Sequence, residues 1–294
     1  MKTCMITEET VKNTIRKRDG EIHKGDCGRL LMVAGSEGMM GAAVLTCRSA
    51  LRSGAGLVQL AVPKALFPVA QVAIPEATCR DRVLSAGDLA VYDAVAIGPG
   101  LGTSKESVET VTQILKEYKG KLVLDADSLN LVAAHRELQE LLNLRKRSGK
   151  GETVITPHVG EAQRLLKGAG LPEGDFRSGQ GRLAAATLLA KSMAVTVVLK
   201  GMGTLVATEG QTTYINTTGN PGMATGGSGD VLTGILTGIW GQKQLGELSS
   251  HTAAICGVYL HGRAGDLAAE KLGEYGLIAG DIAENVPFAI KELF

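Results

Sequence analysis

Short apolar runs alternate with longer segments of helical period along most of the chain. Six runs rich in Val, Ile and Leu, most of them followed by Gly, Pro, Asp or Ser, have the pattern of buried parallel strands. Between them, apolar residues recur at the spacing of amphipathic helices. The predicted strands are RLLMVA (29–34), LVQLAV (57–62), AVAI (94–97), KLVLD (121–125), TVIT (153–156) and VTVVLK (195–200). The predicted helices cover 41–53, 104–118, 160–167, 179–193, 229–240 and 248–271.

This alternation predicts βαβ units around one sheet. The segment LVATEGQTTYIN (205–216) differs, because two short runs flank Glu209-Gly210 and indicate an antiparallel hairpin. The sequence therefore predicts an α/β fold with three layers, α/β/α, a mostly parallel central sheet and a hairpin at one edge. The apolar, small-residue helix at 248–271 is expected to pack either within the subunit or between subunits.

Composition and charge exclude several classes of protein. Of 294 residues, 44% are hydrophobic and 21% charged, which excludes disorder as the main state. No apolar run approaches the ~20 residues that span a bilayer. The net charge of +1 gives no field to attract nucleic acid or a membrane surface. The run RKRSGK (145–150) is interpreted as a solvated loop rather than a binding patch.

Cysteine usage and the N-terminus indicate the compartment. The five cysteines are widely spaced and contain no C-x-x-C pair, which is typical of free thiols in a reducing environment. The first residues are partly acidic and lack the apolar segment of a signal peptide. We therefore expect a cytoplasmic protein with no nucleic-acid or membrane partner.

The glycine-rich segment NTTGNPGMATGGSGD (216–230), just before a predicted helix, is the strongest candidate for chemistry. Glycines such as Gly227 and Gly229 let successive N–H groups converge at the positive end of that helix, where phosphate binds. Asp230 would repel a phosphate there, unless it takes a proton from the hydroxyl that attacks the phosphoryl group. The alternative is that Ser228 or Asp230 only caps the helix.

Two further segments follow predicted strands, where open α/β sheets bind ligands. GPGLG (98–102) is as consistent with a tight turn as with a ligand contact, and neither a P-loop nor a dinucleotide fingerprint is present. DADSLN (125–130) offers Asp127 and Asn130, which would orient a phosphate-bound Mg²⁺ through water. Alternatively, Asp127 is the N-cap of the helix that follows.

Taken in order, six segments of the chain resemble the NAD(P)H-hydrate dehydratases, members of the ribokinase-like superfamily. The resemblance runs from His23 to about Ile282, so we expect an N-terminal extension at 1–22 and a ribokinase-like domain at 23–294. Many members carry an epimerase domain, for which 22 residues are too short; this predicts a stand-alone dehydratase served by a separate NAD(P)H-hydrate epimerase. The six segments are HKGDCGRLLMVAGSEGMMGAAVLTCRSALRSGAGLV, AIGPGLG, DADSLN, ITPHVGE, LKGMGT and GNPGMATGGSGDVLTG.

The resemblance implies a substrate, cofactors and an assembly. The substrate is the S epimer of hydrated NADH or NADPH, the phosphoryl donor is ADP or ATP, Mg²⁺ is required, and the protein is expected to be a homo-oligomer. Phosphorylation turns the ring hydroxyl into a leaving group, after which the ring nitrogen expels phosphate and restores the dihydropyridine.

The resemblance also implies roles for single residues. Asp230 is the implied catalytic base, and Gly227, Ser228 and Gly229 form the anion hole for the transferring phosphoryl group. Considered without the resemblance, Lys200 is equally consistent with a lysine at a strand end whose ammonium reaches solvent. A histidine at the position of His158, directly after a strand, is more often structural than ligand-binding. The implied nucleotide contacts are Lys200, Gly201, Met202, Gly203, Thr204 and Gly229, and the implied substrate contacts are Ala42, Gly102, His158 and Asp230.

Two other functions stay open. A small-molecule kinase, such as a hydroxyethylthiazole or hydroxymethylpyrimidine kinase, shares the GxGD-type turn, although ITPHVGE, GPGLG and LKGMGT favour the dehydratase. The other alternative is a non-catalytic nucleotide-binding protein. On this hypothesis the Asp230→Asn variant keeps its nucleotide affinity and has no activity to lose.

Overall fold

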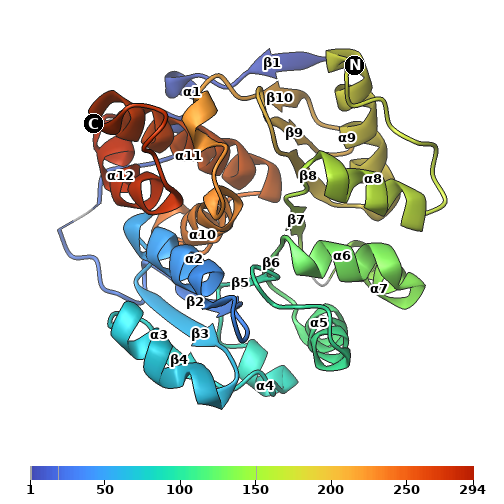
Figure 1. Ribbon diagram of the computed structural model, residues 1–294, viewed down its shortest axis with the longest axis horizontal. Coiled ribbons are helices and arrows are strands. Elements are labelled where there is room, and N and C mark those ends of the chain that lie inside the picture. Colours follow the sequence, from blue (N-terminus) through green and yellow to red (C-terminus); the bar gives the residue numbers. More distant parts are fainter. Residues whose placement is uncertain (1, 19, 150) are drawn as a thin grey trace.

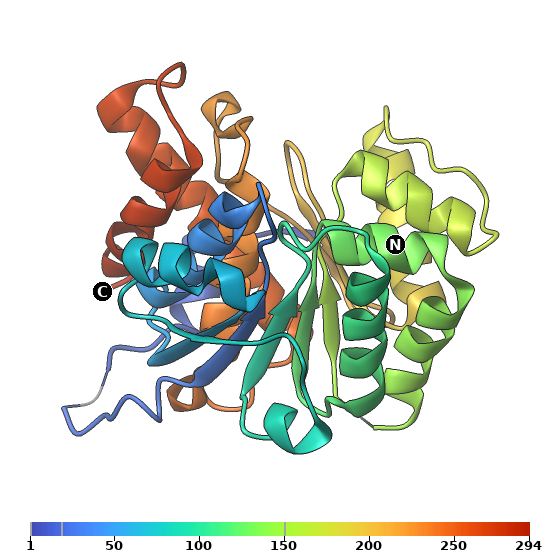
Figure 2. The ribbon, with the colours of Figure 1, turned by 60° about the horizontal axis from the view of Figure 1, so that its bottom comes forward.

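The computed structural model describes residues 2–18, 20–149 and 151–294. Within them one ten-stranded sheet has the order β1-β10-β9-β8-β7-β6-β5-β2-β3-β4. Strand β9 is antiparallel to both β8 and β10, and the other described pairings are parallel. Helices cover both faces of the sheet (Figures 1 and 2). The predicted three-layer α/β/α fold with a mostly parallel sheet is confirmed.

The predicted strands and helices agree with the structure to within two residues at each end. The strands are β1 (Thr3–Met5), β2 (Arg29–Val33), β3 (Leu57–Ala61), β4 (Thr78–Arg80), β5 (Ala94–Ile97), β6 (Lys121–Leu124), β7 (Thr153–Ile155), β8 (Thr196–Leu199), β9 (Leu205–Ala207) and β10 (Thr213–Ile215). The α-helices are α1 (Glu8–Lys12), α2 (Met40–Arg52), α3 (Phe67–Ala73), α4 (Ala86–Leu89), α5 (Lys105–Glu117), α6 (Asp127–Ala134), α7 (Arg136–Arg147), α8 (Val159–Gly168), α9 (Gly179–Met193), α10 (Ser228–Trp240), α11 (Ser250–Leu272) and α12 (Ala279–Lys291). Short 3₁₀ turns are η1 (Lys64–Leu66), η2 (Pro221–Met223) and η3 (Lys243–Leu245).

The predicted hairpin is present as β9 and β10, but it is not the outermost pair of strands. Strand β1 lies outside it and pairs in parallel with β10, from Thr3 opposite Thr213 to Met5 opposite Ile215 (Figure 1). The sequence predicted no element here, because β1 has three residues and none of them is fully buried. Ile6, just beyond it, is completely buried in the core, so the N-terminal segment shares the sheet and core of the domain.

The two faces of the sheet have separate cores. Along β2, Leu30 and Met32 face the core with α2, α10, α11 and α12, whereas Leu31 and Val33 face the core with α5, α6, α8 and α9. This alternation follows from the two-residue period of a strand. Because both faces are covered, every residue of β5 is buried, which explains its unbroken apolar sequence.

Helix α10 is the central helix of the first core. All residues from Val231 to Trp240 are buried. A Cβ at Gly234 would lie 2.0 Å from Ser49 Oγ, so glycine is what allows α10 to pack closely against α2. Helix α11 packs against α10 and α12, so its apolar surface is used within the chain. None of the helices in the described ranges is long and apolar enough to cross a membrane.

One charged segment differs from its prediction as a solvated loop. Arg145 lies on α7 and is buried, with Nη2 donating to the carbonyl of Gly120 at 2.8 Å and Nε donating to Thr153 Oγ1 at 3.3 Å. It shares the inward face of α7 with Leu138 and Leu142, at helical spacing, so the loop prediction is wrong here. Lys150, the last residue of that run, lies outside the described residues. The five cysteines are free, as predicted.

Candidate active site

The carboxyl ends of β6 and β8 bring opposite charges together. Asp125 follows β6 and Lys200 follows β8, and Lys200 Nζ lies 2.7 Å from Asp125 Oδ1. Glu161, in the first turn of α8 after β7, places Oε2 3.8 Å from the same ammonium. Both carboxylates are buried. With Asp230, these residues form what we call the strand-end cluster (Asp125, Glu161, Lys200 and Asp230).

The amino end of α10 adjoins this cluster and has no side-chain cap. Its N-cap is Gly227, with φ +92°, and α10 begins at Ser228. The alternative in which Ser228 or Asp230 only caps the helix is therefore wrong, and the first N–H groups of α10 remain available to an anion. The backbone conformation at Gly227 favours glycine, and a Cβ there would lie 2.4 Å from Leu45 Cδ1, so the leucine side chain would have to move.

Asp125 joins α10 to the sheet. Its Oδ1 pairs with Lys200, and its Oδ2 accepts a hydrogen bond from Thr233 Oγ1 at 2.7 Å. Thr233 lies five residues beyond Ser228 on α10 and is completely buried. The position of the helix amino end is thus fixed by a buried carboxylate whose two oxygens are both engaged.

Asp230 has the properties of a base near neutral pH. Burial and the nearby carboxylate of Asp125 raise its pKa to about 7, Lys200 opposes this change, and Asp127 and Glu161 add to it. A carboxylate with this pKa accepts a proton far more readily than an exposed aspartate. This environment suits the general-base role predicted for Asp230.

Lys200 is a largely buried partner of carboxylates, with 19% of its side chain exposed, so the alternative of an edge lysine with an exposed head is wrong. Burial alone would lower the pKa of its ammonium, but the charges of Asp125 and Glu161 outweigh burial and raise it. A Cβ at Gly229 would lie 3.1 Å from Lys200 Nζ. The ammonium therefore lies beside the amino end of α10, where a phosphate would arrive.

The predicted nucleotide loop follows Lys200 directly. Gly201 and Gly203 have φ values of +138° and +62°, and Thr204 Oγ1 donates to the carbonyl of Gly201 at 2.8 Å. Met202, at the tip, is 95% exposed. Arg182, in the first turn of α9, donates from Nη1 to the carbonyl of Met202 at 2.6 Å. The loop is open to solvent on one side and held from the other.

His158 has a structural role that the sequence left open. It is the N-cap of α8, and its Nδ1 accepts from the N–H groups of Gly160 at 3.0 Å and Glu161 at 3.4 Å. Glu161 Oε2 in turn accepts from the N–H of His158 at 2.8 Å. Its Nε2 lies 3.4 Å from Glu161 Oε1, and the side chain is 54% exposed, so part of the ring remains accessible to a ligand.

The GPGLG turn packs against the segment that carries Ala42. A Cβ at Gly100 would lie 3.0 Å from the Cβ of Ala42, in the first turn of α2. Gly102, at φ +76°, donates its N–H to Asp127 Oδ2 at 2.8 Å. The structure thus places the predicted substrate positions Ala42 and Gly102 in one region, beside Asp127.

Asp127 is the first residue of α6, whose N-cap is Ala126, so the prediction of Asp127 as an N-cap is wrong. The carbonyl oxygen of the Asn130 side chain accepts from Arg164 Nε at 3.0 Å. Among the described residues, no group of three or more His, Cys, Asp or Glu side chains is arranged to hold a metal.

Comparison with known proteins shows which family this arrangement belongs to. Residues 30–287 match the family model described as NAD(P)H-hydrate dehydratase. The chain belongs to this family. The ADP-dependent (S)-NAD(P)H-hydrate dehydratase of Neisseria meningitidis is 37% identical over 273 residues, which cover 92% of this chain and 88% of that protein.

Other members of the dehydratase family that resemble this chain are longer proteins. The bifunctional NAD(P)H-hydrate repair enzyme Nnr of Moorella thermoacetica is 37% identical over 302 residues, covering 98% of this chain and 54% of that protein. The chain thus spans about half the length of the bifunctional relatives that it matches. The ADP/ATP-dependent dehydratase of Bacillus subtilis, co-crystallized with ATP/Mg²⁺, has a TM-score of 0.82 and 29% identity, and the match covers 99% of this chain and 98% of that one. Solved neighbours include a ribokinase-like superfamily protein, so the predicted ribokinase-like fold is confirmed.

Several residues of this dehydratase-family site were not selected from the sequence. Asp125, Thr233 and Arg182 meet the predicted residues only in the folded chain. The signal for Asp125 was its place directly after a strand, but nothing marked its partners. His261, on α11, also lies at the site, with Nε2 3.3 Å from Ser228 Oγ.

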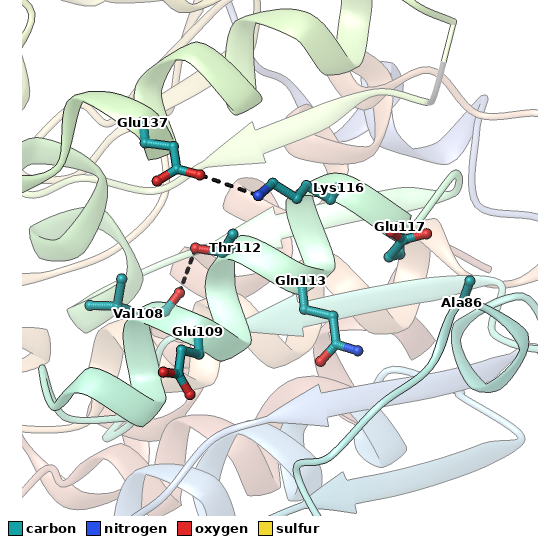
Figure 3. A pocket seen from close by; sticks show the side chains of 8 residues that line it. All are labelled: Ala86, Val108, Glu109, Thr112, Gln113, Lys116, Glu117 and Glu137. Atoms are coloured by element: carbon teal, nitrogen blue, oxygen red, sulfur yellow. Dashed lines mark hydrogen bonds and ion pairs between the residues drawn. The ribbon is translucent and has the colours of Figure 1, made fainter.

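A separate groove lies away from the strand ends, along the outer side of α5 (Figure 3). Its volume is about 710 Å³. Lys116 pairs with Glu137 across it at 3.2 Å, and Thr112 Oγ1 donates to the carbonyl of Val108 at 2.8 Å. These are ordinary contacts of exposed helices, and the groove holds no residue of the strand-end cluster. The lining residues are Ala86, Val108, Glu109, Thr112, Gln113, Lys116, Glu117 and Glu137.

Proposed function

We propose that the protein removes water from the S epimer of hydrated NADH or NADPH, using ADP or ATP as phosphoryl donor, and so restores the damaged coenzyme. The observation that carries the proposal is the position of Asp230, a partly buried carboxylate with a pKa of about 7 in the first turn of an uncapped helix. The name of the Neisseria meningitidis relative, an ADP-dependent (S)-NAD(P)H-hydrate dehydratase, supports the same reaction.

In the first chemical step, Asp230 takes the proton of the ring hydroxyl as the hydroxyl oxygen forms a bond to the terminal phosphorus of the donor. The bond between that phosphorus and the bridging oxygen breaks, and the nucleotide leaves one phosphate shorter. The N–H groups of Gly227, Ser228 and Gly229 stabilise the charge on the transferring group. Lys200 adds a positive charge beside Gly229.

In the second step, the carbon–oxygen bond of the new phosphate ester breaks. The ring nitrogen supplies the electron pair that expels phosphate, the adjacent ring carbon then loses a proton, which the released phosphate takes up, and the carbon–carbon double bond of the dihydropyridine is restored. With ATP, hydrated NADH gives NADH, ADP, phosphate and the proton first taken by Asp230. No oxidant or reductant is required.

The predicted ligand contacts divide between two regions of the site. We assign the nucleotide to the loop from Lys200 to Thr204 together with Gly229, and the hydrated nicotinamide to Ala42, Gly102 and His158. A Mg²⁺ carried with the nucleotide would supply positive charge that offsets the charge of the phosphates. Asp127 would hold it through water, and the engaged amide oxygen of Asn130 makes Asn130 the weaker candidate.

The test is a repair assay with purified protein and the separated S epimer of hydrated NADH or NADPH. Return of the reduced-coenzyme absorbance that depends on ATP or ADP supports the proposal. A stable phosphorylated alcohol as end product would instead identify a small-molecule kinase. A protein that binds nucleotide but turns over neither hydrate would be a non-catalytic binder.

Asp230→Asn provides the matched control for the chemistry. We expect turnover to fall by about 10²-fold or more while nucleotide binding is kept, because only proton removal is lost. Unchanged turnover in this variant would exclude Asp230 as the base.

The biological setting is part of the same proposal. We propose a cytoplasmic homo-oligomer that works with a separate epimerase activity, since the R epimer must be converted before this site accepts it. The bifunctional names of the longer relatives support the link between epimerase and dehydratase. Light scattering during chromatography measures the assembly, and a mixture of both epimers shows whether added epimerase is required for complete repair.

A further inference from the structure

The nucleotide loop (Lys200 to Thr204) is in direct contact with an arginine of α9. Arg182 donates from Nη1 to the carbonyl of Met202 at 2.6 Å. A Cβ at Gly201 would lie 3.2 Å from Arg182 Nη2, so the guanidinium also lies against the main chain of Gly201. The loop is therefore held from the side of α9 by a cation.

Most hydrogen-bond donors of this guanidinium are unused. Nε and Nη2 of Arg182 are both buried, and neither has a hydrogen-bond partner within the described ranges of the chain. Burial lowers the pKa of Arg182, and no nearby carboxylate opposes this change. Because an arginine stays protonated even so, Arg182 places an unbalanced positive charge beside the loop.

This environment differs from that of a surface arginine with carboxylate partners. Arg263, for comparison, donates from Nε and Nη2 to the two carboxylate oxygens of Glu292 and from Nη1 to Glu270. Buried charges in proteins are normally paired and hydrogen-bonded in this way, because an unpaired one is costly. An anion bound at the loop would supply the negative charge that Arg182 lacks.

The ammonium at the start of the same loop is already balanced. Lys200 Nζ lies 2.7 Å from Asp125 and 3.8 Å from Glu161. Two carboxylates against one ammonium leave a net charge of −1 there, before Asp230 is counted. This negative charge repels the phosphates of a nucleotide, so an unbalanced cation such as Arg182 on the other side of the loop has a direct use.

We propose that Arg182 is a positioning residue for the nucleotide: it holds the main chain of Gly201 and Met202 and supplies positive charge for the phosphates of ADP or ATP. The proposal rests on the proposed function, which assigns the nucleotide to this loop. A purely structural contact with the loop would need only a neutral donor. The charge itself is therefore what the experiments must test.

Two variants separate charge from hydrogen bonding. Arg182→Lys keeps the charge and one donor for the Met202 carbonyl, and Arg182→Gln keeps only a neutral donor. In isothermal titration at about 0.15 M salt, the Lys variant should bind ADP within about threefold of the wild type and the Gln variant about tenfold more weakly. Equal losses in the two variants, or wild-type affinity in the Gln variant, would overturn the proposal.

Salt and a ligand without phosphates test the same charge. The loss of ADP affinity in Arg182→Gln should nearly disappear at about 1 M salt, where the Debye length is about 3 Å. Adenosine should bind the Gln variant and the wild type equally, because it carries no phosphate. A loss of the same size for adenosine and ADP would show that Arg182 only shapes the loop, and the proposal would be wrong.

Lys191→Gln is the matched control for the loss of one positive charge. Lys191 is exposed in the last turn of the same helix, nine residues beyond Arg182. Nine residues span about 14 Å of helix, which exceeds the Debye length of about 8 Å at physiological salt. ADP affinity should therefore be unchanged. A loss as large as that of Arg182→Gln would indicate a general charge effect and contradict the proposal.

Thermal unfolding gives a readout that does not depend on activity. Arg182→Met removes a buried charge with unused donors, so its Tm without nucleotide should not fall below that of the wild type. The rise in Tm caused by ADP should be smaller than in the wild type, because binding is weaker. A marked fall in Tm without nucleotide would show that Arg182 is needed for the fold itself and would overturn the proposal.

The repair assay completes the test. In Arg182→Gln, the nucleotide KM should rise about tenfold with kcat within about twofold, since the charge acts on the ground state and the transition state alike. A fall in kcat with unchanged KM would contradict this role. Failure of the wild type to bind ADP or ATP would overturn the proposed function as well, whereas normal wild-type binding with an unaffected Gln variant would overturn only the role of Arg182.

Discussion

Replacing the proposed base by its neutral isostere is expected to stabilise the fold at neutral and alkaline pH. Burial, Asp125 and the other nearby carboxylates raise the pKa of Asp230 from 3.8 to about 7. Folding therefore favours the protonated carboxyl. The resulting stabilisation is fully present below pH about 4 and is lost as the pH rises through about 7. Asp230→Asn stays neutral throughout and avoids this loss.

The expected size of this stabilisation follows from the change in the pKa of Asp230 on folding. One pKa unit corresponds to about 1.4 kcal/mol, so a change from 3.8 to about 7 corresponds to about 4 kcal/mol. Solvent screening of the partly exposed carboxylate reduces this, and we expect a free energy of unfolding higher by about 2–3 kcal/mol in Asp230→Asn at pH 8. In a domain of this size, that is about 5 °C in Tm.

The assay compares thermal unfolding of the wild type and Asp230→Asn from pH about 4.5 to about 8.5. Glu247→Gln, at an exposed position, controls for the loss of one negative charge. The Tm difference should be small at the acid end, grow between pH 5 and 7 and then level off. A difference independent of pH, or a less stable Asn variant at pH 8, would refute the reasoning. The same variant should lose repair activity while its fold gains stability, which separates chemistry from folding.

Three further predictions test the site. The value of kcat/KM should fall about tenfold for each pH unit below about 7, as Asp230 becomes protonated, and a flat pH–rate profile down to pH 5 would contradict this. Gly226→Ala should be tolerated, because nothing lies within 4 Å of the added Cβ. Gly227→Ala should reduce both Tm and kcat, because the residue has a positive φ and its added Cβ meets Leu45. Equal Tm and kcat in the two variants would contradict this reasoning. Lys200→Met should lower the free energy of unfolding by about 3–5 kcal/mol, because it leaves the Asp125 carboxylate without its positive partner. The double variant with Asp125→Asn should recover part of this loss in urea unfolding. Absence of such recovery would show that the two residues are not coupled.

The sequence was most informative where one local pattern determined the structure. The central parallel strands such as β5, β7 and β8 are buried on both faces, so their unbroken apolar runs were visible without any knowledge of partners, whereas the short, more exposed β4 was not predicted. Strand β1 was missed because its stability comes from pairing with β10, about 210 residues away, and not from its own three residues. Arg145 was misinterpreted because charge suggested solvent, while the helical phase of α7 turned it inward.

At the site, the sequence indicated the open amino end of α10 but not how the charged side chains around it are arranged. The glycines before Asp230 predicted an open helix end, because glycine has a specific conformational meaning there. Asp125 contacts Lys200 and Thr233, which lie 75 and 108 residues further along the chain. No local sequence pattern predicts contacts over such distances. The capping role of His158 was equally invisible, since a histidine at an N-cap is uncommon.

The central claim is that the coenzyme hydroxyl becomes a phosphate ester before it leaves, and the fate of its oxygen tests this most directly. Hydrated NADH carrying heavy oxygen at the ring hydroxyl is incubated with wild-type protein and ATP, and the released phosphate and water are examined by mass spectrometry. The account predicts that the heavy oxygen is recovered in inorganic phosphate, in equal amount to the NADH restored. Recovery of the heavy oxygen in water, with unlabelled phosphate, would contradict it.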